Sequence, residues 1–178
     1  MQANISKRIV IPCTFAYLNC WRKGENNGGK YSMTAIIDKS DQETVTRIME
    51  KIEDVTQAST AKWGGKVPAN LKTPLHDGDV EKADNSIFKN KYYINAKSSV
   101  KPEVVDSNLE AIINQTDIYS GCSGNVSITL YAYSHNGNRG IAACLGNIQK
   151  IKDGNPLVPY YSAKDDFSVQ KEQEDTDQ

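Results

Sequence analysis

The sequence contains no apolar run that approaches the roughly 20 residues needed for a membrane-spanning helix. Its first residues, Met1 to Arg8, are polar and lack the apolar core of a secretory signal peptide. We therefore expect a protein of the cytosol, with no membrane partner. The length of 178 residues and the 38% hydrophobic content fit one globular domain rather than a disordered chain.

Sequence patterns for metal ions and disulfides are also missing. The four cysteines, Cys13, Cys20, Cys122 and Cys144, form no CxxC pair and have no histidine at zinc-finger spacing. We expect them to be small, half-buried thiols of a reducing compartment. The sequence therefore predicts neither a metal site nor a cofactor.

Motifs for catalysis are scarce. The chain has two histidines and no Gly-x-Ser-x-Gly, phosphate-loop or dinucleotide motif. Its one acidic cluster, Asp77, Asp79 and Glu81 beside His76, offers hard oxygen ligands that could hold Mg²⁺ in a nuclease. Asp-Gly-Asp is also an ordinary turn sequence, and the pattern favours a solvated turn over a metal site. We expect a protein that is not an enzyme, with a metal-dependent nuclease as the alternative.

Charge is balanced over the whole chain but unevenly distributed along it. Residues 164–178 carry six acids against two lysines, and the rest of the chain holds 19 bases against 16 acids. A mildly basic body with an acidic end suggests a polyanion-binding surface and a segment that competes for it. A solvated terminus that aids solubility explains the same pattern. The acids of this regulatory tail are Asp165, Asp166, Glu172, Glu174, Asp175 and Asp177.

The first third of the sequence predicts a hairpin followed by a helix. Residues 9–18 read as a strand with Pro12 at an edge or bulge, 19–30 as a Gly- and Asn-rich loop, and 31–37 as the partner strand.

A helix should follow this hairpin. Ser40 and Glu43 have capping-box spacing, an apolar face recurs at helical spacing, and the helix should end near Ser59. The residues of that face are Val45, Ile48, Met49, Ile52 and Val55.

The second half of the sequence favours strands. After an irregular stretch over 61–91, residues 92–98 alternate as a strand, and 125–149 form a hairpin around Asn136-Gly137, the strongest short hairpin signal. Gly121 and Gly124 allow a bulge or close backbone approach.

About five or six strands and one capped helix, without a repeating βαβ rhythm, fit a mainly β fold. We expect a closed Greek-key barrel of the OB-fold type, although a small sandwich fits the same strand count. The predicted barrel domain spans residues 1–163, and residues 164–178 form the flexible acidic tail.

Aromatic residues beside lysines and arginines favour nucleic-acid binding. Single strands are held by aromatic side chains that stack on bases and by cations that track the phosphates. Two tryptophans lie in Gly-rich, Lys-flanked loops, although strand tyrosines are common in any β-protein. The candidate DNA-binding residues are Trp21, Arg22, Lys23, Lys30, Tyr31, Lys62, Trp63, Lys66, Tyr93, Lys97, Tyr119, Tyr131, Tyr133 and Arg139.

Three blocks of sequence, residues 29–41, 74–79 with 93–102, and 118–150, resemble a family of phage-encoded single-stranded-DNA-binding proteins. The resemblance spans about Ile9 to Pro156 and implies an OB-fold with an acidic tail. It also implies DNA binding without sequence preference and a role in phage replication or recombination. Tyr119 is carried over from the family motif as a candidate for contact with DNA. The resemblance also implies that the segment around Asp77 is structural rather than catalytic.

The resulting hypothesis is a groove of aromatics and lysines that hosts either a single strand or the protein's own tail. Single-stranded DNA displaces the tail, which is then free to recruit a phage replication or recombination protein. RNA binding and a homodimer remain open. An adaptor or virion component whose basic face binds an acidic protein is a further alternative.

Overall fold

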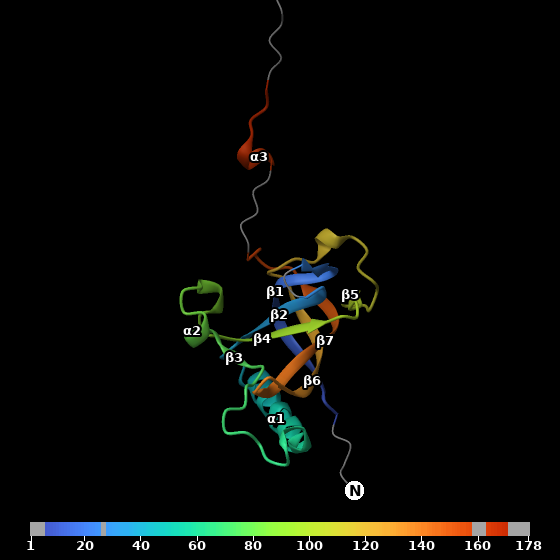
Figure 1. The fold of residues 1–178 in the computed structure, drawn as a ribbon. Coiled ribbons are helices and arrows are strands. Elements are labelled where there is room, and N and C mark those ends of the chain that lie inside the picture. The colour runs from blue at the N-terminus through green and yellow to red at the C-terminus, as the bar shows by residue number, and fades with distance from the viewer. Residues whose placement is uncertain (1–5, 26–27, 158–162, 171–178) are drawn as a thin grey trace, which may run out of the picture.

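Five long strands close into a barrel in the computed structural model, which describes residues 6–25, 28–157 and 163–170 (Figure 1). The hydrogen-bonded order is β4-β2-β1-β6-β7, and a parallel pairing of β4 with β7 closes the ring. The closed ring confirms the predicted barrel and excludes the sandwich. The strands are β1 (Arg8–Gly24), β2 (Lys30–Asp38), β4 (Lys91–Ser98), β6 (Ser123–His135) and β7 (Asn138–Lys152).

Strand β1 is long enough to pair with two neighbouring strands. Its first half pairs with β6, and from Thr14 onward it pairs with β2. Pro12 lies in the half that has β6 alone as its partner, which confirms its expected place at an edge. The predicted loop begins too early, because β1 continues to Gly24 through two register shifts that keep its irregular end paired.

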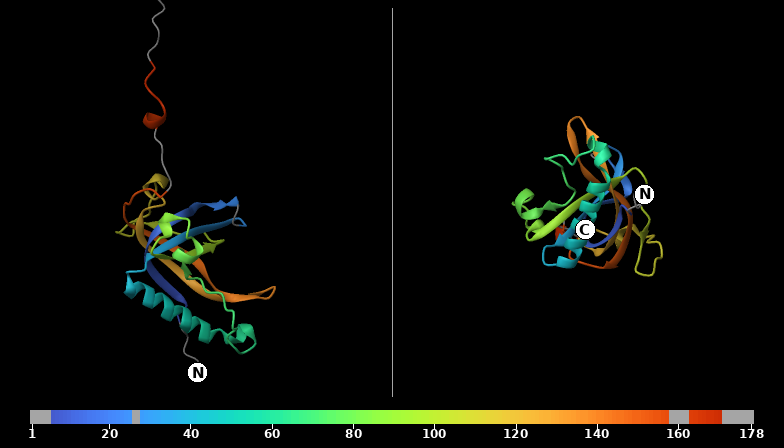
Figure 2. Two further views of the ribbon diagram at one scale, coloured as in Figure 1. Left: turned by 90° about the vertical axis from the view of Figure 1, so that its left-hand side faces the viewer. Right: turned by 90° about the horizontal axis from the view of Figure 1, so that it is seen from below.

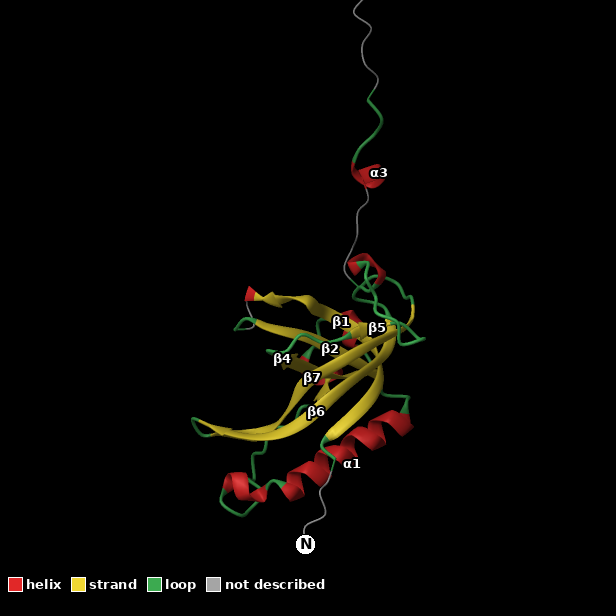
Figure 3. Cartoon of the chain, turned by 90° about the vertical axis from the view of Figure 1, so that its right-hand side faces the viewer, coloured by secondary structure: helices red, strands yellow, loops and turns green. Residues whose placement is uncertain are grey.

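The hairpin of β6 and β7 is the clearest success of the sequence prediction. Asn136 and Gly137 join the strands with φ angles of 51° and 80°, as a two-residue hairpin turn requires. The β1–β2 and β6–β7 hairpins project beyond the barrel in the same direction (Figures 2 and 3). Gly124 has the predicted close approach, because a Cβ there would lie 1.9 Å from the carbonyl oxygen of Gln149.

Helix α1 (Gln42–Ala58) lies along one end of the barrel (Figure 1). The helix was expected to be capped by Ser40, but Asp41 is the cap, and its side chain accepts a hydrogen bond from the Thr44 amide at 3.3 Å. Ser59 ends the helix as expected. Met49 does not belong to the buried face, because 47% of its surface is exposed while Ile48 is buried.

The connection between α1 and β4 contains short elements rather than a continuous loop. They are the 3₁₀ helix η2 (Thr60–Trp63), strand β3 (His76–Asp77), helix α2 (Gly78–Glu81) and the 3₁₀ helix η3 (Ser86–Phe88). Residue Lys72 adds an isolated bridge to Gly140 at the edge of β7. This connection therefore runs along the outer face of the barrel beside β7, where the candidate site lies.

The remaining elements lie at the other end of the barrel or beyond it. They are β5 (Val104–Val105), the 3₁₀ helix η4 (Gln115–Asp117) and α3 (Ala163–Asp166). None of the helices in the described ranges has the length and hydrophobicity that a membrane crossing requires.

All four cysteines are free thiols, and Cys13, Cys20 and Cys122 are buried. Burial raises the pKa of Cys20 to about 11, which keeps this thiol protonated and unreactive at neutral pH.

Candidate nucleic-acid interface

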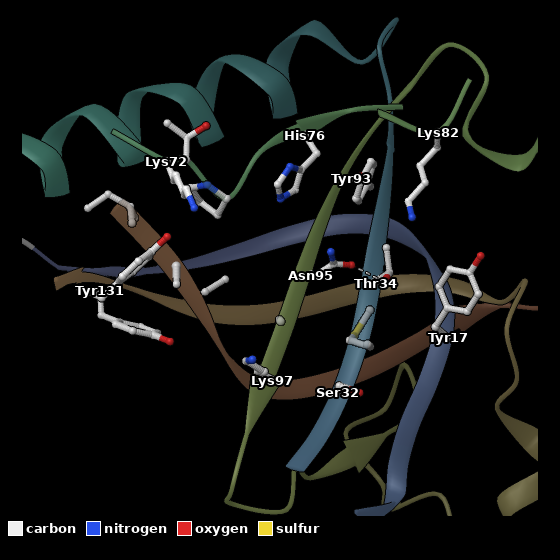
Figure 4. A pocket seen from close by; sticks show the side chains of 18 of the residues that line it. Tyr17, Ser32, Thr34, Lys72, His76, Lys82, Tyr93, Asn95, Lys97 and Tyr131 are labelled. Carbon is white, nitrogen blue, oxygen red and sulfur yellow. Dashed lines mark hydrogen bonds between the residues drawn. The ribbon is translucent and has the colours of Figure 1, made fainter. Parts of the chain in front are cut away.

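A groove of about 550 Å³ crosses the outer face of the barrel (Figure 4). Alternation along the strands creates its floor: Ala35 and Ile94 point into the core, whereas Thr34 and Asn95 point outward. The described residues that line it include no carboxylate. The lining residues are Tyr17, Asn19, Ser32, Met33, Thr34, Lys72, Thr73, Pro74, His76, Lys82, Phe88, Tyr93, Asn95, Ala96, Lys97, Tyr131, Tyr133, Ile141, Ala142 and Ala143.

Exposed tyrosines stand on opposite sides of the groove. Tyr17 is 51% exposed and Tyr131 is 41% exposed. The bulge in β1 places Tyr17 at φ 48°, a left-handed conformation that costs a non-glycine residue about 1–2 kcal/mol. The ring of Tyr17 is nearly parallel to that of Phe88, with centroids 6.3 Å apart and an interplanar angle of 18°. Local strain is therefore retained where an aromatic face is presented to the groove.

Two contacts from the α1–β4 connection hold the β6–β7 hairpin beside the groove. Trp63 donates its indole N–H to the carbonyl of Tyr133 at 3.0 Å. On the β7 edge, the Lys72 amide donates to the carbonyl oxygen of Arg139 at 3.0 Å. The Ile141 amide donates to the carbonyl oxygen of Lys72 at 2.8 Å. Gly140 permits this approach, because a Cβ there would lie 2.5 Å from the Lys72 carbonyl oxygen. These contacts fix where Tyr131 and Tyr133 stand.

Positive charge in the groove comes from Lys72, Lys82 and Lys97. Lys97 projects from β4, and the other two come from the α1–β4 connection, so the cations flank the floor from two elements. Burial raises the pKa of Tyr131, so its phenol is neutral over the physiological range. The groove thus combines neutral aromatic rings with ammonium groups, the chemistry that holds bases and phosphates.

Residues 7–177 match the sequence model of a family described as Enterobacter phage Enc34, ssDNA-binding protein. The chain belongs to this family. A curated relative, putative protein p50 of Acyrthosiphon pisum secondary endosymbiont phage 1, is 28% identical over 159 residues, which cover 82% of this chain and 83% of that protein.

Solved structures agree with this assignment. The single-stranded DNA-binding protein from bacteriophage Enc34, in complex with ssDNA, matches with a TM-score of 0.71 and 26% identity over 84% of this chain and 89% of that chain. The single-stranded DNA binding protein gp2.5 of bacteriophage T7 matches with a TM-score of 0.59 and 15% identity over 93% of this chain and 99% of that chain. The second likeness concerns the fold alone. Together with the closed five-stranded barrel, these matches confirm the OB-fold prediction and the resemblance to phage single-stranded-DNA-binding proteins.

Only part of the predicted site in this member of the Enc34 family lies in the groove. Tyr93, Lys97, Tyr131 and Tyr133 line it, while Arg139 is exposed beside the β6–β7 turn. The groove residues missed by the sequence analysis include Tyr17, Lys72, Lys82 and Asn95. Asn95 alternates with Tyr93 and Lys97 on β4, so its position was visible in the sequence. Tyr17 had no such signal, because its orientation depends on the bulge.

Two of the residues predicted to stack on bases, Trp63 and Tyr93, have buried rings. Trp63 is 7% exposed and belongs to the main core, so its ring is not available to a base. Tyr93 lines the groove but is 4% exposed, because His76 stacks on it at 4.9 Å and Phe88 meets it edge-on at the same distance. The lysines beside Trp63, Lys62 and Lys66, are exposed outside the groove.

A second group of predicted residues clusters on the β1–β2 hairpin, outside the groove. Lys23 lies over the ring of Tyr31 at 6.0 Å, and Lys101 lies over that of Trp21 at 5.9 Å. Trp21 is half-buried against the core, and within the described part of the chain its buried Nε1 has no hydrogen-bond partner. The other two members are Arg22, which is exposed, and Lys30, which is half-buried.

Tyr119 also lies outside the groove. Its hydroxyl donates to the carbonyl of Gly154 at 2.8 Å, and Lys150 lies over its ring at 5.7 Å. Gly121 has φ 122°, and a Cβ there would lie 2.1 Å from the Asn155 carbonyl oxygen. The predicted close backbone approach is therefore present, but its partner is the segment that follows β7.

The acidic cluster of the nuclease alternative is occupied by structural contacts. The Lys39 ammonium lies 2.6 Å from Asp77 and 2.7 Å from Asp79, and the hydrogen bond from Lys39 lowers the pKa of Asp79. Glu81 contacts His76 at 2.8 Å. In the described ranges, no group of three His, Cys, Asp or Glu side chains has the arrangement of a metal site. The nuclease alternative therefore has no support, and the cluster lies in β3 and α2 rather than in the turn that the sequence favoured.

The structure describes little of the predicted tail. Asp165 and Asp166 fall in α3, whereas Glu172, Glu174, Asp175 and Asp177 lie outside the described residues.

Proposed function

We propose that this chain binds single-stranded DNA without sequence dependence by laying it across the outer groove between Tyr17 and Tyr131. The observation that carries this proposal is a carboxylate-free groove with exposed rings on two sides and three lysines between or beside them. In this role the protein protects and organises single strands in the cytoplasm of a bacterial host during phage replication or recombination. It does so by binding alone, without catalysing a reaction.

The strand order gives the course of the proposed path. It runs from Tyr17 on β1 over β2 and β4 to β7 and Tyr131 on β6. OB-folds cover roughly 4–16 nucleotides of a single strand. The β1–β2 hairpin, with Lys23 and Tyr31, would extend the contacts beyond this path.

The central test substitutes the two exposed tyrosines one at a time. Tyr17→Ala and Tyr131→Ala should each weaken binding to oligo-dT by about 5- to 150-fold, because each lost stacking platform contributes about 1–3 kcal/mol. Filter binding with duplex competitor measures this effect. Lys51→Ala is the control for each, because Lys51 lies on α1 and bonds to the Ser6 carbonyl at 3.0 Å. Wild-type affinity in both tyrosine variants would contradict the proposed path.

We also propose that residues 164–178 form a regulatory tail outside the domain of residues 1–163. The net charge of −4 in this segment makes it a weak phosphate mimic that competes for the lysines of the groove. Displaced by DNA, the tail becomes available to a replication or recombination protein. The free protein should be checked for a homodimer by sedimentation, since a neighbouring tail could compete in the same way.

Deleting residues 164–178 should tighten single-strand binding, and most strongly at low salt, where charge competition is least screened. A full-length variant with the six acids replaced by Asn or Gln should behave like the deletion. Affinity that is unchanged or weaker in both proteins would remove the tail from the mechanism.

A further inference from the structure

Asn95 occupies the floor of the groove in a fixed orientation. It lies on β4 directly opposite Thr34 of β2. The Thr34 hydroxyl donates to Oδ1 of Asn95 at 2.7 Å, and Thr34 is only 5% exposed. Of the two amide orientations, only the one in the structure gives the hydroxyl hydrogen an acceptor on Asn95, because a flipped amide would present its NH₂ donor to Thr34 instead.

This orientation determines what Asn95 offers to a ligand. With Oδ1 turned toward Thr34, the amide nitrogen points away from it into the groove (Figure 4). An amide nitrogen carries two hydrogens and only donates hydrogen bonds. Lys97, two residues along the same face of β4, adds another donor-only group. The edge of a base that rests on this part of the floor therefore faces the hydrogen-bond donors of Asn95 and Lys97.

We propose that Asn95 reads base edges and that Thr34 is its positioning residue, so that the groove prefers thymine and guanine to cytosine and adenine. Thymine O4 and guanine O6 accept a hydrogen bond where cytosine N4 and adenine N6 carry donors. An amino group facing the Asn95 nitrogen places two donors together and leaves both without a partner. This inference rests on the proposed function and adds a graded base preference to binding that no specific sequence controls.

Oligo-dT, oligo-dU and oligo-dC of equal length test this preference at neutral pH. All three are pyrimidines, and dU separates the effect of the O4 acceptor from that of the thymine methyl group. The wild-type protein should bind oligo-dT and oligo-dU with similar affinity and oligo-dC about fivefold more weakly, which is the effect of one net hydrogen bond. The ratio of the oligo-dC and oligo-dU dissociation constants is the readout, because uniform electrostatic effects cancel in it.

Three variants assign the preference to the Asn95–Thr34 pair. Asn95→Asp replaces the donor with an acceptor and should reverse the ratio, while Thr34→Val frees the amide to turn and should bring the ratio toward one. Thr34→Ser keeps the hydroxyl and should restore the wild-type ratio. Lys82→Gln removes a groove lysine that lies outside β4 and is the matched control, which should weaken binding to all three oligonucleotides without changing the ratio.

The outcomes separate this inference from the proposed function. A wild-type ratio of one, or a wild-type ratio that persists in Asn95→Asp and Thr34→Val, overturns the role of Asn95 while single-strand binding stands. An absence of wild-type binding to every oligonucleotide contradicts the proposed function instead. Thermal unfolding of each variant shows whether the barrel is intact, and Thr34→Val carries the test if Asn95→Asp fails to fold.

Discussion

At the scale of single residues, the two tryptophans show how similar sequence surroundings can end in different environments. Both lie near lysines and glycines in the sequence, but Trp63 is a core residue that donates to Tyr133. Trp21 is half-buried, and its indole nitrogen has no partner among the described residues. The contribution of the indole N–H to the free energy of unfolding should therefore differ between Trp63 and Trp21.

This difference predicts opposite results for the same substitution. Trp63→Phe should lower the free energy of unfolding by about 1–3 kcal/mol, because it leaves the Tyr133 carbonyl without its donor. Trp21→Phe removes a buried donor that is already unsatisfied and should be neutral or slightly stabilising. Urea unfolding of the two variants measures both, and an equal loss in each would contradict the assigned environments.

At the scale of elements, the β6–β7 hairpin depends on the connection that precedes β4. Trp63 holds one strand of this hairpin, and the backbone of Lys72 pairs with the other. The connection was predicted as irregular, and its role in placing Tyr131 and Tyr133 depends on contacts between residues about 70 positions apart in the sequence. The hairpin itself was predictable from the sequence, whereas the contacts of Trp63 and Lys72 that hold it were not.

Gly140→Ala tests this support. The new Cβ would lie 2.5 Å from the Lys72 carbonyl oxygen and 2.8 Å from the Tyr133 hydroxyl. We expect a loss of about 1–3 kcal/mol in unfolding free energy from overpacking, together with weaker binding to oligo-dT as Tyr133 is displaced. Ser134→Ala on the same hairpin is the control, and an exposed change of this kind should alter stability by no more than about 0.5 kcal/mol. Normal DNA affinity in Gly140→Ala would show that the hairpin position is unimportant for binding.

At the scale of the whole molecule, the sequence predicted the fold better than the site. Alternation and the Asn136-Gly137 turn are local signals, so the β6–β7 hairpin and the other strands were found, although β1 continues past its predicted end to Gly24. The groove was only partly found, because Tyr17, Lys72 and Lys82 reach it through a bulge and a long connection. Lysine next to an aromatic residue in sequence does not show whether the ring faces solvent, as Trp63 demonstrates.

The central claim is that a single strand lies along the groove between Tyr17 and Tyr131, and photochemical crosslinking tests it most directly. Oligonucleotides with 5-iodouracil at successive positions would be irradiated with the protein, and the crosslinked peptides identified by mass spectrometry. We expect crosslinks on Tyr17 and Tyr131, with Tyr133 as a further site. Crosslinks confined to Trp21 and Tyr31 on the β1–β2 hairpin, with none in the groove, would contradict the account.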